Sequence, residues 1–401
     1  MLLLAVAACG NSTPTPTPTP SPTAFYSIPA PTFASPTPTI VPVPTSAFVA
    51  PSTAKYVLDD ARSKALQSKL ADIVAGGKYP GISAAVLFPD GTIWSGVSGQ
   101  AVLKPAQALT TDTLFSVGSI SKTFVAAMIG RLAAAGTIGM DDPLSRYEPD
   151  FPNADNITIR ELLNHTSGIQ DLFSAPGIAD SLLTHPTQSW TPEQVLAKIG
   201  APYFAPGKGY RYSNTNFVLL GLVIEKVTGQ TVASLVRSAF LTPLGMTNTY
   251  LQTEETAQGP IAHGYMEPPA KPVDNQAGTM LPFTAEATAV GFAGAYVSTA
   301  TDLAKWANAL YNGSILDKAT LAAMADTSAS LKYKPKTPYG LGLEQASLNS
   351  QLTWGHRGLL DGFWSAMEYL PAYHITVVSL INANWADPVT ADAALFEAAI
   401  S

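Results

Sequence analysis

An apolar segment without a polar face constrains the fold of this 401-residue chain more than any other feature. Residues 123–135 (TFVAAMIGRLAAA) place aliphatic, aromatic and small side chains on nearly every side of a helix. Such a helix belongs inside a protein, so the fold has to enclose it. Gly118 allows a sharp entry into the segment, and Gly136 ends it. Because 46% of the residues are hydrophobic, the chain can build the large core that this helix requires.

Ser119 and Lys122 stand at the start of this helix, three residues apart and therefore on one face. A serine hydroxyl is a poor nucleophile until a base takes its proton, and a lysine in an apolar, crowded site can lose its charge and do so. The helix N-terminus also offers N–H groups to a developing oxyanion. Ser-x-x-Lys is a short pattern, however, and a second copy at residues 52–55 has no apolar helix behind it. The catalytic interpretation therefore needs support from the rest of the chain.

A second motif, Tyr212-Ser213-Asn214, follows a Gly/Pro-rich loop and precedes a helical pattern that begins at Phe217. A tyrosine near a lysine cation is expected to have a lowered pKa and can act as a general base or proton shuttle. The Asn214 amide has a donor and an acceptor for a substrate amide. The alternative is a surface loop in which the asparagine caps the helix.

A third motif, His356-Arg357-Gly358, is predicted at the end of a strand. Gly358 would let a substrate backbone lie close to that strand. His356 could lend a proton or polarise the site. The alternative is a sheet histidine beside a bulge glycine.

The strand signals lie at both ends of the globular part of the chain, which we place at residues 54–401. Residues 81–88 and 92–97 are joined by Pro89-Asp90-Gly91 and predict a hairpin, and further strands are predicted at 352–356, 363–369 and 375–381. Between them the pattern is mostly helical. We therefore predict an α+β fold, an antiparallel sheet flanked by helices with an inserted all-helical subdomain. The α/β part comprises residues 54–136 and 286–401, and the helical part comprises residues 137–285.

The first 53 residues have a different composition. Residues 1–9 form a short apolar segment that ends at Cys9, the only cysteine, and resemble a bacterial lipoprotein signal in which that cysteine is lipidated. Residues 10–53 are a Pro/Thr-rich linker, expected to be disordered and to reach about 100 Å as an extended tether. We expect an extracytoplasmic protein, lipid-anchored to the bacterial cell membrane or secreted. Such a tether suits an enzyme of the cell wall and is also consistent with mere display at the cell surface.

Several partners and cofactors are not expected. The net charge is −7 without a Lys/Arg cluster, which argues against nucleic acid. The remaining histidines show no metal-ligand spacing, and no phosphate loop or dinucleotide fingerprint is present, so neither a metal nor another cofactor is predicted. One cysteine cannot form an intrachain disulfide. We expect a monomer whose membrane contact is through the N-terminal anchor alone.

The three motifs in the order Ser-x-x-Lys, Tyr-x-Asn and His-x-Gly are far more specific together than separately. On these residues the chain resembles the serine β-lactamase and penicillin-binding protein family, most of all the branch with class C β-lactamases, D-alanyl-D-alanine carboxypeptidases and related esterases. The resemblance runs from about Lys78 to the C-terminus and includes residues 162–169, 212–229, 243–246 and 291–310.

This resemblance implies a β-lactamase/transpeptidase-like fold and an acyl-transfer mechanism. Ser119 would attack a carbonyl, and Lys122 and Tyr212 would share the proton transfers. The backbone N–H groups of Ser119 and Leu359 would form the oxyanion hole. Asn214 would hold the substrate amide, and the substrate would also contact the strand formed by His356, Arg357 and Gly358.

Two positions affect how far the resemblance extends. Arg357 stands where the family often has Thr or Ser, and it could bind a substrate carboxylate or point away and indicate a different substrate. Glu161 superficially resembles the deacylating glutamate of class A β-lactamases. We interpret it as structural, because its neighbours at residues 165–168 match the class C-like branch.

Three functions follow from these motifs. The favoured one is a D-alanyl-D-alanine carboxypeptidase-like hydrolase acting on cell-wall peptides. The second is a β-lactamase or esterase using the same residues on a lactam or ester, although class C β-lactamases usually have Lys where His356 stands. The third is a non-catalytic penicillin- or wall-binding protein, against which the intact Ser119, Lys122 and Tyr212 argue.

Overall fold

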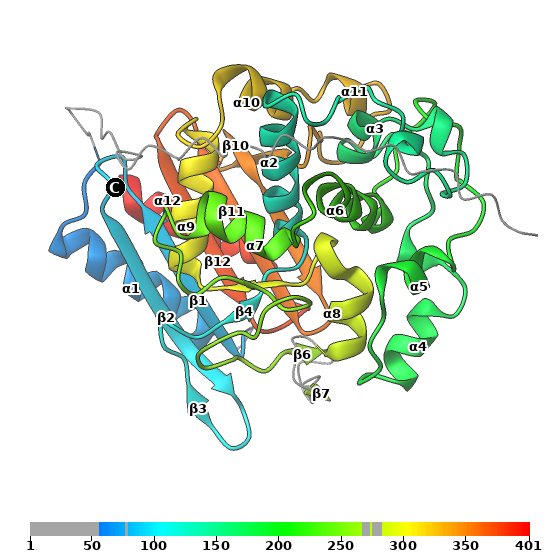
Figure 1. The fold of residues 1–401 in the computed structure, drawn as a ribbon. Coiled ribbons are helices and arrows are strands. Elements are labelled where there is room, and N and C mark those ends of the chain that lie inside the picture. Colours follow the sequence, from blue (N-terminus) through cyan, green and yellow to red (C-terminus); the bar gives the residue numbers. More distant parts are fainter. Residues whose placement is uncertain (1–55, 77–78, 267–272, 275–282) are drawn as a thin grey trace, which may run out of the picture. The chain divides into compact units, whose positions relative to one another are not determined.

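The computed structural model describes residues 56–76, 79–266, 273–274 and 283–401 (Figure 1). The signal-like segment with Cys9 and the linker at residues 10–53 lie outside the described residues. In the part of the chain that is described, no single helix has the length and apolar composition to cross a membrane. One bent pair of helices, residues 214–228 and 232–241, reaches that length and apolar composition only when the two are counted together.

A seven-stranded antiparallel sheet contains strands from both ends of the domain. Its order is β3-β2-β1-β12-β11-β10-β9, so the last strand of the chain pairs with the first, with Ile82 opposite Ile381. This confirms the predicted antiparallel sheet. The strands are β1 (Gly81–Leu87), β2 (Ile93–Val102), β3 (Gln107–Ala108), β9 (Glu344–Leu348), β10 (Gln351–Leu360), β11 (Phe363–Leu370) and β12 (Ile375–Ile381).

Two of these strands differ from the prediction in a way that matters for the site. Strand β9 was not predicted, because the four residues before its final leucine, Glu344 to Ser347, include no large apolar side chain. Strand β10 continues to Leu360, so the His-x-Gly motif lies inside a strand and not at its end.

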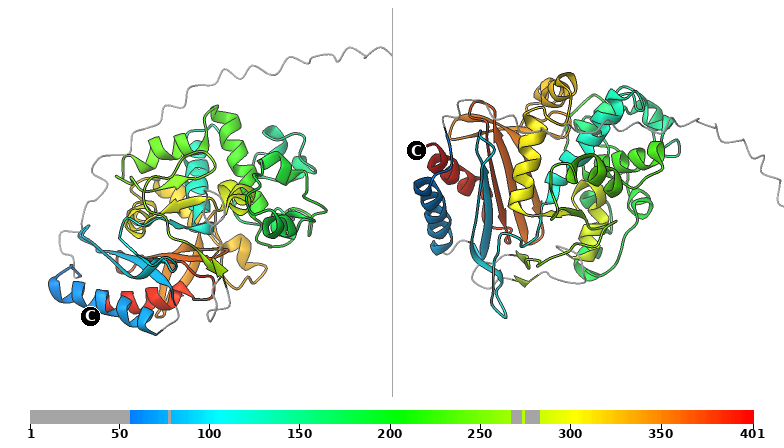
Figure 2. Two further views of the ribbon diagram at one scale, coloured as in Figure 1. Left: turned by 90° about the horizontal axis from the view of Figure 1, so that it is seen from below. Right: turned by 60° about the vertical axis from the view of Figure 1, so that its left-hand side comes forward.

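Helices cover both faces of the sheet (Figure 2). On one face, α1 (Asp60–Ala75) and α12 (Pro388–Ile400) pack against each other and against the strands. On the other face, α9 (Ala300–Tyr311) packs on β1 and β12. The sheet therefore separates two apolar cores. The larger one, on the α9 side, also contains the apolar segment at residues 123–135.

That segment is helix α2 (Ser121–Ala134), and it is buried as predicted. Phe124 stacks between Tyr296 and Trp306, with ring centroids 4.6 and 4.4 Å away. A 3₁₀ turn, η1 (Gly118–Ile120), leads into α2, and Gly118 has a φ of 51°. Ser119 thus lies in this turn, two residues before the first residue of the α-helix, Ser121, and not in the first α-helical turn.

The remaining described helices and short strands lie outside the seven-stranded sheet. Helix α6 (Asn214–Thr228) begins at Asn214 and not at Phe217, so Asn214 belongs to its first turn. The other helices are α3 (Ile159–Leu163), α4 (Ile178–Thr184), α5 (Pro192–Leu196), α7 (Val232–Val236), α8 (Thr284–Val290), α10 (Lys318–Ala325) and α11 (Ser328–Leu331). Short strands are β4 (Phe115–Ser116), β8 (Tyr296–Ser298) and β5 (Tyr250–Leu251) in one sheet, and β6 (Tyr265–Met266) with β7 (Val273–Asp274) in another.

Candidate active site

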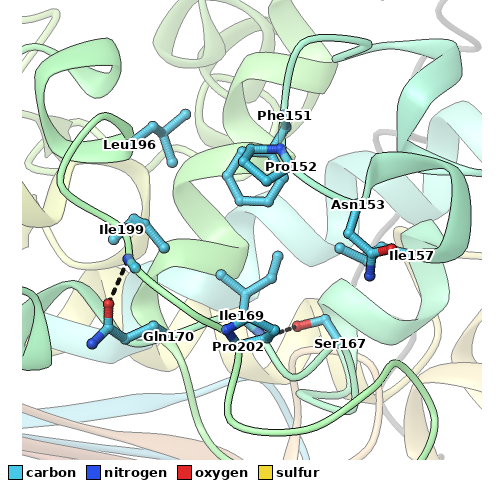
Figure 3. Close-up of a pocket in the computed structure, with 11 residues that line it drawn as sticks. Phe151, Pro152, Asn153, Ile157, Ser167, Ile169, Gln170, Leu196, Ile199 and Pro202 are labelled. Atoms are coloured by element: carbon cyan, nitrogen blue, oxygen red, sulfur yellow. Dashed lines mark hydrogen bonds between the residues drawn. The ribbon is translucent and has the colours of Figure 1, made fainter.

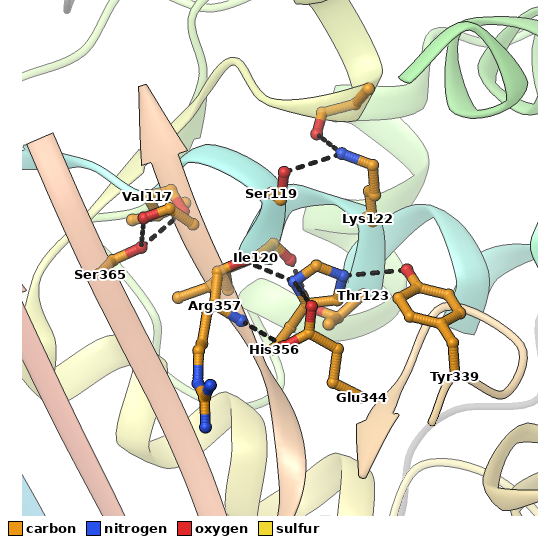
Figure 4. A network of polar contacts seen from close by, with 12 residues as sticks. Val117, Ser119, Ile120, Lys122, Thr123, Tyr339, Glu344, His356, Arg357 and Ser365 are labelled. Atoms are coloured by element: carbon orange, nitrogen blue, oxygen red, sulfur yellow. Dashed lines mark hydrogen bonds and ion pairs between the residues drawn. The ribbon is translucent and has the colours of Figure 1, made fainter. Parts of the chain in front are cut away.

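The turn that carries Ser119 is held against strand β10. The Ser365 hydroxyl, on β11, lies 2.8 Å from the carbonyl oxygen of Val117 and 3.2 Å from that of Gly358, and so links the turn to the strand (Figure 4). A Cβ added to Gly358 would lie 2.0 Å from the Val117 oxygen and 2.9 Å from the Ser119 nitrogen. Glycine at 358 is therefore required by the close approach of the nucleophile turn itself, in addition to any approach of a substrate.

Lys122 is fully buried and points at Ser119. Its Nζ lies 2.9 Å from Ser119 Oγ and donates to Asn214 Oδ1 at 2.7 Å and to the Ala293 carbonyl oxygen at 2.8 Å. In the neutral form, two N–H groups keep the last two bonds, and the lone pair can accept the Ser119 proton. Burial lowers the pKa of Lys122 from 10.5 to about 7, although the nearby carboxylates of Asp171 and Glu344 raise it. The geometry therefore suits a base that works near neutral pH.

Tyr212 differs from the expectation of a lowered pKa. Lys122 Nζ lies 4.9 Å from the centroid of its ring, and the side chain is half-buried with its hydroxyl oxygen buried. Burial raises the pKa of Tyr212 well above 10, and the interaction with the Ser119 hydroxyl offsets this only in part. The two hydroxyls do not meet the geometry of a hydrogen bond. Tyr212 is thus a neutral phenol that can transfer a proton. It is poorly suited to be a phenolate before the reaction begins.

An acidic residue outside the three motifs holds Asn214 in place. Asp171 Oδ2 accepts from the backbone N–H of Asn214 at 2.6 Å and from its Nδ2 at 2.9 Å. The other amide atom of Asn214, Oδ1, accepts from Lys122. Both ends of this side chain are therefore engaged within the protein, and Asn214 connects the lysine to Asp171 as well as facing the pocket.

His356 is a neutral imidazole. Its Nδ1–H donates to the carbonyl oxygen of Arg357 at 2.6 Å, so Nε2 accepts from the Tyr339 hydroxyl at 2.9 Å. Burial, aided by the positive charge of Lys122, lowers the pKa of His356 to about 3. The expectation that His356 lends a proton does not hold near neutral pH, because its one N–H is already bound. Figure 4 shows the His356 ring directed at the Tyr339 hydroxyl, so the contacts of this side chain are with other residues of the protein.

Arg357 points away from Ser119 (Figure 4). Its Nε lies 3.3 Å from Oε1 of Glu368, which is buried. Its backbone N–H donates to Glu344 Oε2, also at 3.3 Å. Of the two alternatives for this residue, the structure therefore has the one in which the guanidinium is directed away from the nucleophile.

These elements enclose a pocket of about 320 Å³. It brings together Ser119, Tyr212, Asn214, Arg357, Gly358 and Leu359 from the prediction, with Lys122 and His356 buried beside them. Ser119 and Leu359, whose backbone N–H groups are predicted to form the oxyanion hole, both line this pocket. Sequence reasoning missed the other lining residues, which are Phe173, Val290, Glu344, Leu360 and Trp364.

A second pocket lies in the helical part and measures about 70 Å³ (Figure 3). Its lining is mostly apolar, with Phe151, Ile157 and Ile169 among the residues. Gln170 closes one side by accepting from the backbone N–H of Gly200 at 2.7 Å. Its lining contains no charged residue or histidine, so the larger pocket is the candidate active site. Among the described residues, no group of three or more His, Cys, Asp or Glu side chains could hold a metal ion.

The fold and this site define a class, the serine hydrolases with a β-lactamase and penicillin-binding protein fold. Residues 66–400 match the family model named Beta-lactamase, and the chain therefore belongs to the β-lactamase family.

Solved structures and one relative agree with this assignment. A D-stereospecific amidohydrolase from Streptomyces sp. is 32% identical with a TM-score of 0.71, and the match covers 82% of this chain and 97% of that one. The D-amino acid amidase from Ochrobactrum anthropi SV3 is 31% identical with a TM-score of 0.74, covering 84% and 98%. A penicillin-binding protein of Bacillus subtilis (strain 168) is 29% identical over 71% of this chain. The chain spans only 64% of that relative's length.

Proposed function

We propose that this protein is a serine amidohydrolase that cleaves small peptides or amino-acid amides through an acyl-enzyme on Ser119. The observation that carries the proposal is the contact of 2.9 Å between Lys122 Nζ and Ser119 Oγ, at the wall of a pocket that Leu359 also lines. A buried amine whose pKa lies near 7 is matched to proton abstraction from a serine at physiological pH.

The reaction follows from these positions. Ser119 Oγ attacks the substrate carbonyl while Lys122 takes its proton, and the amides of Ser119 and Leu359 stabilise the oxyanion. Tyr212 donates its phenolic proton to the leaving nitrogen, whose bond to the carbonyl carbon then breaks, and Lys122 returns the serine proton to Tyr212. Water next attacks the ester on Ser119 while the neutral Lys122 takes one of its protons. The bond between the carbonyl carbon and Oγ breaks, and that proton passes to Oγ.

The bond that is cleaved is proposed to be an amide. Two similar proteins of 31–32% identity are described as a D-stereospecific amidohydrolase and a D-amino acid amidase, which supports amide cleavage and a D-configured acyl group. D-alanyl-D-alanine carboxypeptidase activity on cell-wall peptides, favoured by the sequence, is one form of this chemistry and stays a prediction. An enzyme anchored through Cys9 outside the cell would meet such peptides, and mass spectrometry of the protein from membranes tests that anchor.

The experiment is a substrate panel with matched serine variants. Wild type, Ser119→Ala and Ser52→Ala are assayed on a D-alanyl-D-alanine peptide, D-phenylalanine amide, a chromogenic cephalosporin and a p-nitrophenyl ester. Ser52 is the control because it stands in the second Ser-x-x-Lys copy. We expect amide hydrolysis to fall at least about 10³-fold in Ser119→Ala and to be unchanged in Ser52→Ala. Turnover of the lactam or ester alone would favour the β-lactamase or esterase function, and hydrolysis unchanged in Ser119→Ala would refute the proposal.

A further inference from the structure

An acidic side chain that belongs to none of the three motifs lines the pocket. Glu344 is on strand β9, opposite Gly355, and its side chain is 18% exposed. Its Oε2 accepts from the backbone N–H of Arg357 at 3.3 Å. Its Oε1 lies 3.9 Å from His356 Nδ1, but that N–H donates to a carbonyl oxygen. A nearly buried carboxylate with one long hydrogen bond is poorly satisfied, so it can accept a further donor from the pocket.

The nearest cation offsets this charge only in part. The positive charge of Arg357 lowers the pKa of Glu344, but its guanidinium Nε lies 3.3 Å from the buried Glu368, so two acidic side chains accompany one guanidinium. Two further charged groups belong to this site. One is Lys122 itself, and the other is Asp171, which raises the pKa of Lys122. Three acidic side chains thus stand against at most two cations, and Lys122 carries no charge in the form that can act as the base. Burial raises the pKa of Glu344 to about 7, and a cation or N–H donor bound beside it would favour the carboxylate form.

This charge balance bears on the substrate. Above the pKa of Glu344, about 7, a substrate carboxylate placed beside it would meet a like charge in a mostly buried place, which is unfavourable. A primary amide or an ammonium group would instead donate a hydrogen bond to Glu344. Tyr212 lines the same pocket as Glu344, and it is the residue proposed to protonate the leaving nitrogen.

We infer that Glu344, with Arg357 and Glu368, is a specificity determinant that selects substrates with an uncharged or cationic nitrogen group next to the scissile bond and rejects those with a carboxylate there. The substrates are then amino-acid amides or peptide amides. This inference rests on the proposed amidohydrolase function and narrows it. Arg357 acts as the counter-ion of Glu368 in this arrangement.

The test uses two substrates that differ in one group, D-alanyl-D-alaninamide and D-alanyl-D-alanine. At pH 8.5, where Glu344 is ionised, wild type should prefer the carboxamide by about tenfold or more in kcat/KM, and Glu344→Gln should reduce that preference about tenfold, mainly by improving the carboxylate substrate. Glu397→Gln is the control, because it removes one exposed acidic charge from α12. Its preference should equal that of wild type. A wild-type preference for the carboxylate, or a Glu344→Gln preference equal to that of wild type, would overturn the inference.

Binding measurements separate this inference from the proposed chemistry. In Ser119→Ala, calorimetric titration with the same two compounds reports recognition without acylation. Tighter binding of the carboxamide by about tenfold supports the role of Glu344 even if no hydrolysis is found in wild type, in which case the proposed function fails alone. Equal binding of both compounds refutes the charge selection. Because this arm keeps Glu344, it does not depend on the folding of the Glu344→Gln variant.

Discussion

Replacing Lys122 with methionine should stabilise the domain near and below pH 7 while it removes acylation. Lowering the pKa of a buried lysine from 10.5 to about 7 corresponds to about 5 kcal/mol, at about 1.4 kcal/mol per pKa unit. This is the free energy by which burial of the ammonium destabilises the fold at low pH. Methionine leaves Ser119 Oγ, Asn214 Oδ1 and the Ala293 oxygen without their donor, at about 1 kcal/mol each. The net stabilisation at pH 6 is then about 2 kcal/mol.

The pH dependence of this difference has a definite sign. Between pH 7 and 10.5 the unfolded chain holds a proton on Lys122 that the folded protein has lost, so wild-type stability rises with pH in that window. Below pH 7 both states are protonated and the full destabilisation remains. The advantage of Lys122→Met should therefore fall by about 3 kcal/mol between pH 7 and 9 and change sign.

Urea denaturation of both proteins at pH 6, 7, 8 and 9 measures this difference in the free energy of unfolding. The contributions of groups that are not coupled to Lys122 are the same in both proteins and cancel. Lys64→Met, an exposed lysine on α1, is the control and should differ little from wild type at every pH. The acylation rate of Lys122→Met should fall by about 10²–10⁴, the range for loss of a general base. A variant that is less stable than wild type at pH 6, or a difference that does not change with pH, would refute the reasoning.

The acylation rate of the wild-type enzyme should rise with pH through about 7, because only the neutral amine of Lys122 can take the serine proton, and rates of adduct formation between pH 5 and 9 measure this; a flat profile would exclude that base. Gly358→Ala should lower acylation by about 10²–10³ and stability by about 1–3 kcal/mol, since the new Cβ would meet the Val117 oxygen at 2.0 Å. Gly76→Ala, which has room at the end of α1, is its control in both assays. Asp171→Ala should release the amide that anchors the lysine and lower kcat about 10²-fold, with binding of substrate less affected; unchanged steady-state kinetics would show that Asp171 does not position the site.

The sequence predicted those parts of the site that short motifs encode. Ser119 and Lys122 are brought together by one helical turn, and the apolar run behind them already required burial. The antiparallel sheet was predictable because period-two apolar runs and a Pro-Asp-Gly turn are local signals. Gly358 was recognised as a position of close approach, although its neighbour is the nucleophile turn.

The remainder depends on contacts between residues far apart in the chain. Asp171 reaches Asn214 across 43 residues, and nothing in its own neighbourhood marks it. Glu344 lies on a strand whose mostly polar residues hid it from the pattern. The pKa of Tyr212 was predicted in the wrong direction because the sequence indicates a lysine nearby but not the burial of the phenol, and burial is the larger effect. Trp364 lines the pocket as well, although it belongs to none of the three motifs.

The central claim is that Ser119 carries the acyl group, and trapping that group tests it most directly. The protein is incubated with benzylpenicillin, quenched in acid after times from milliseconds to minutes, and examined by intact mass and peptide mapping. We predict one adduct with the mass of penicillin, located on Ser119 and absent from Ser119→Ala. An adduct on another residue, or the same adduct in Ser119→Ala, would contradict the account.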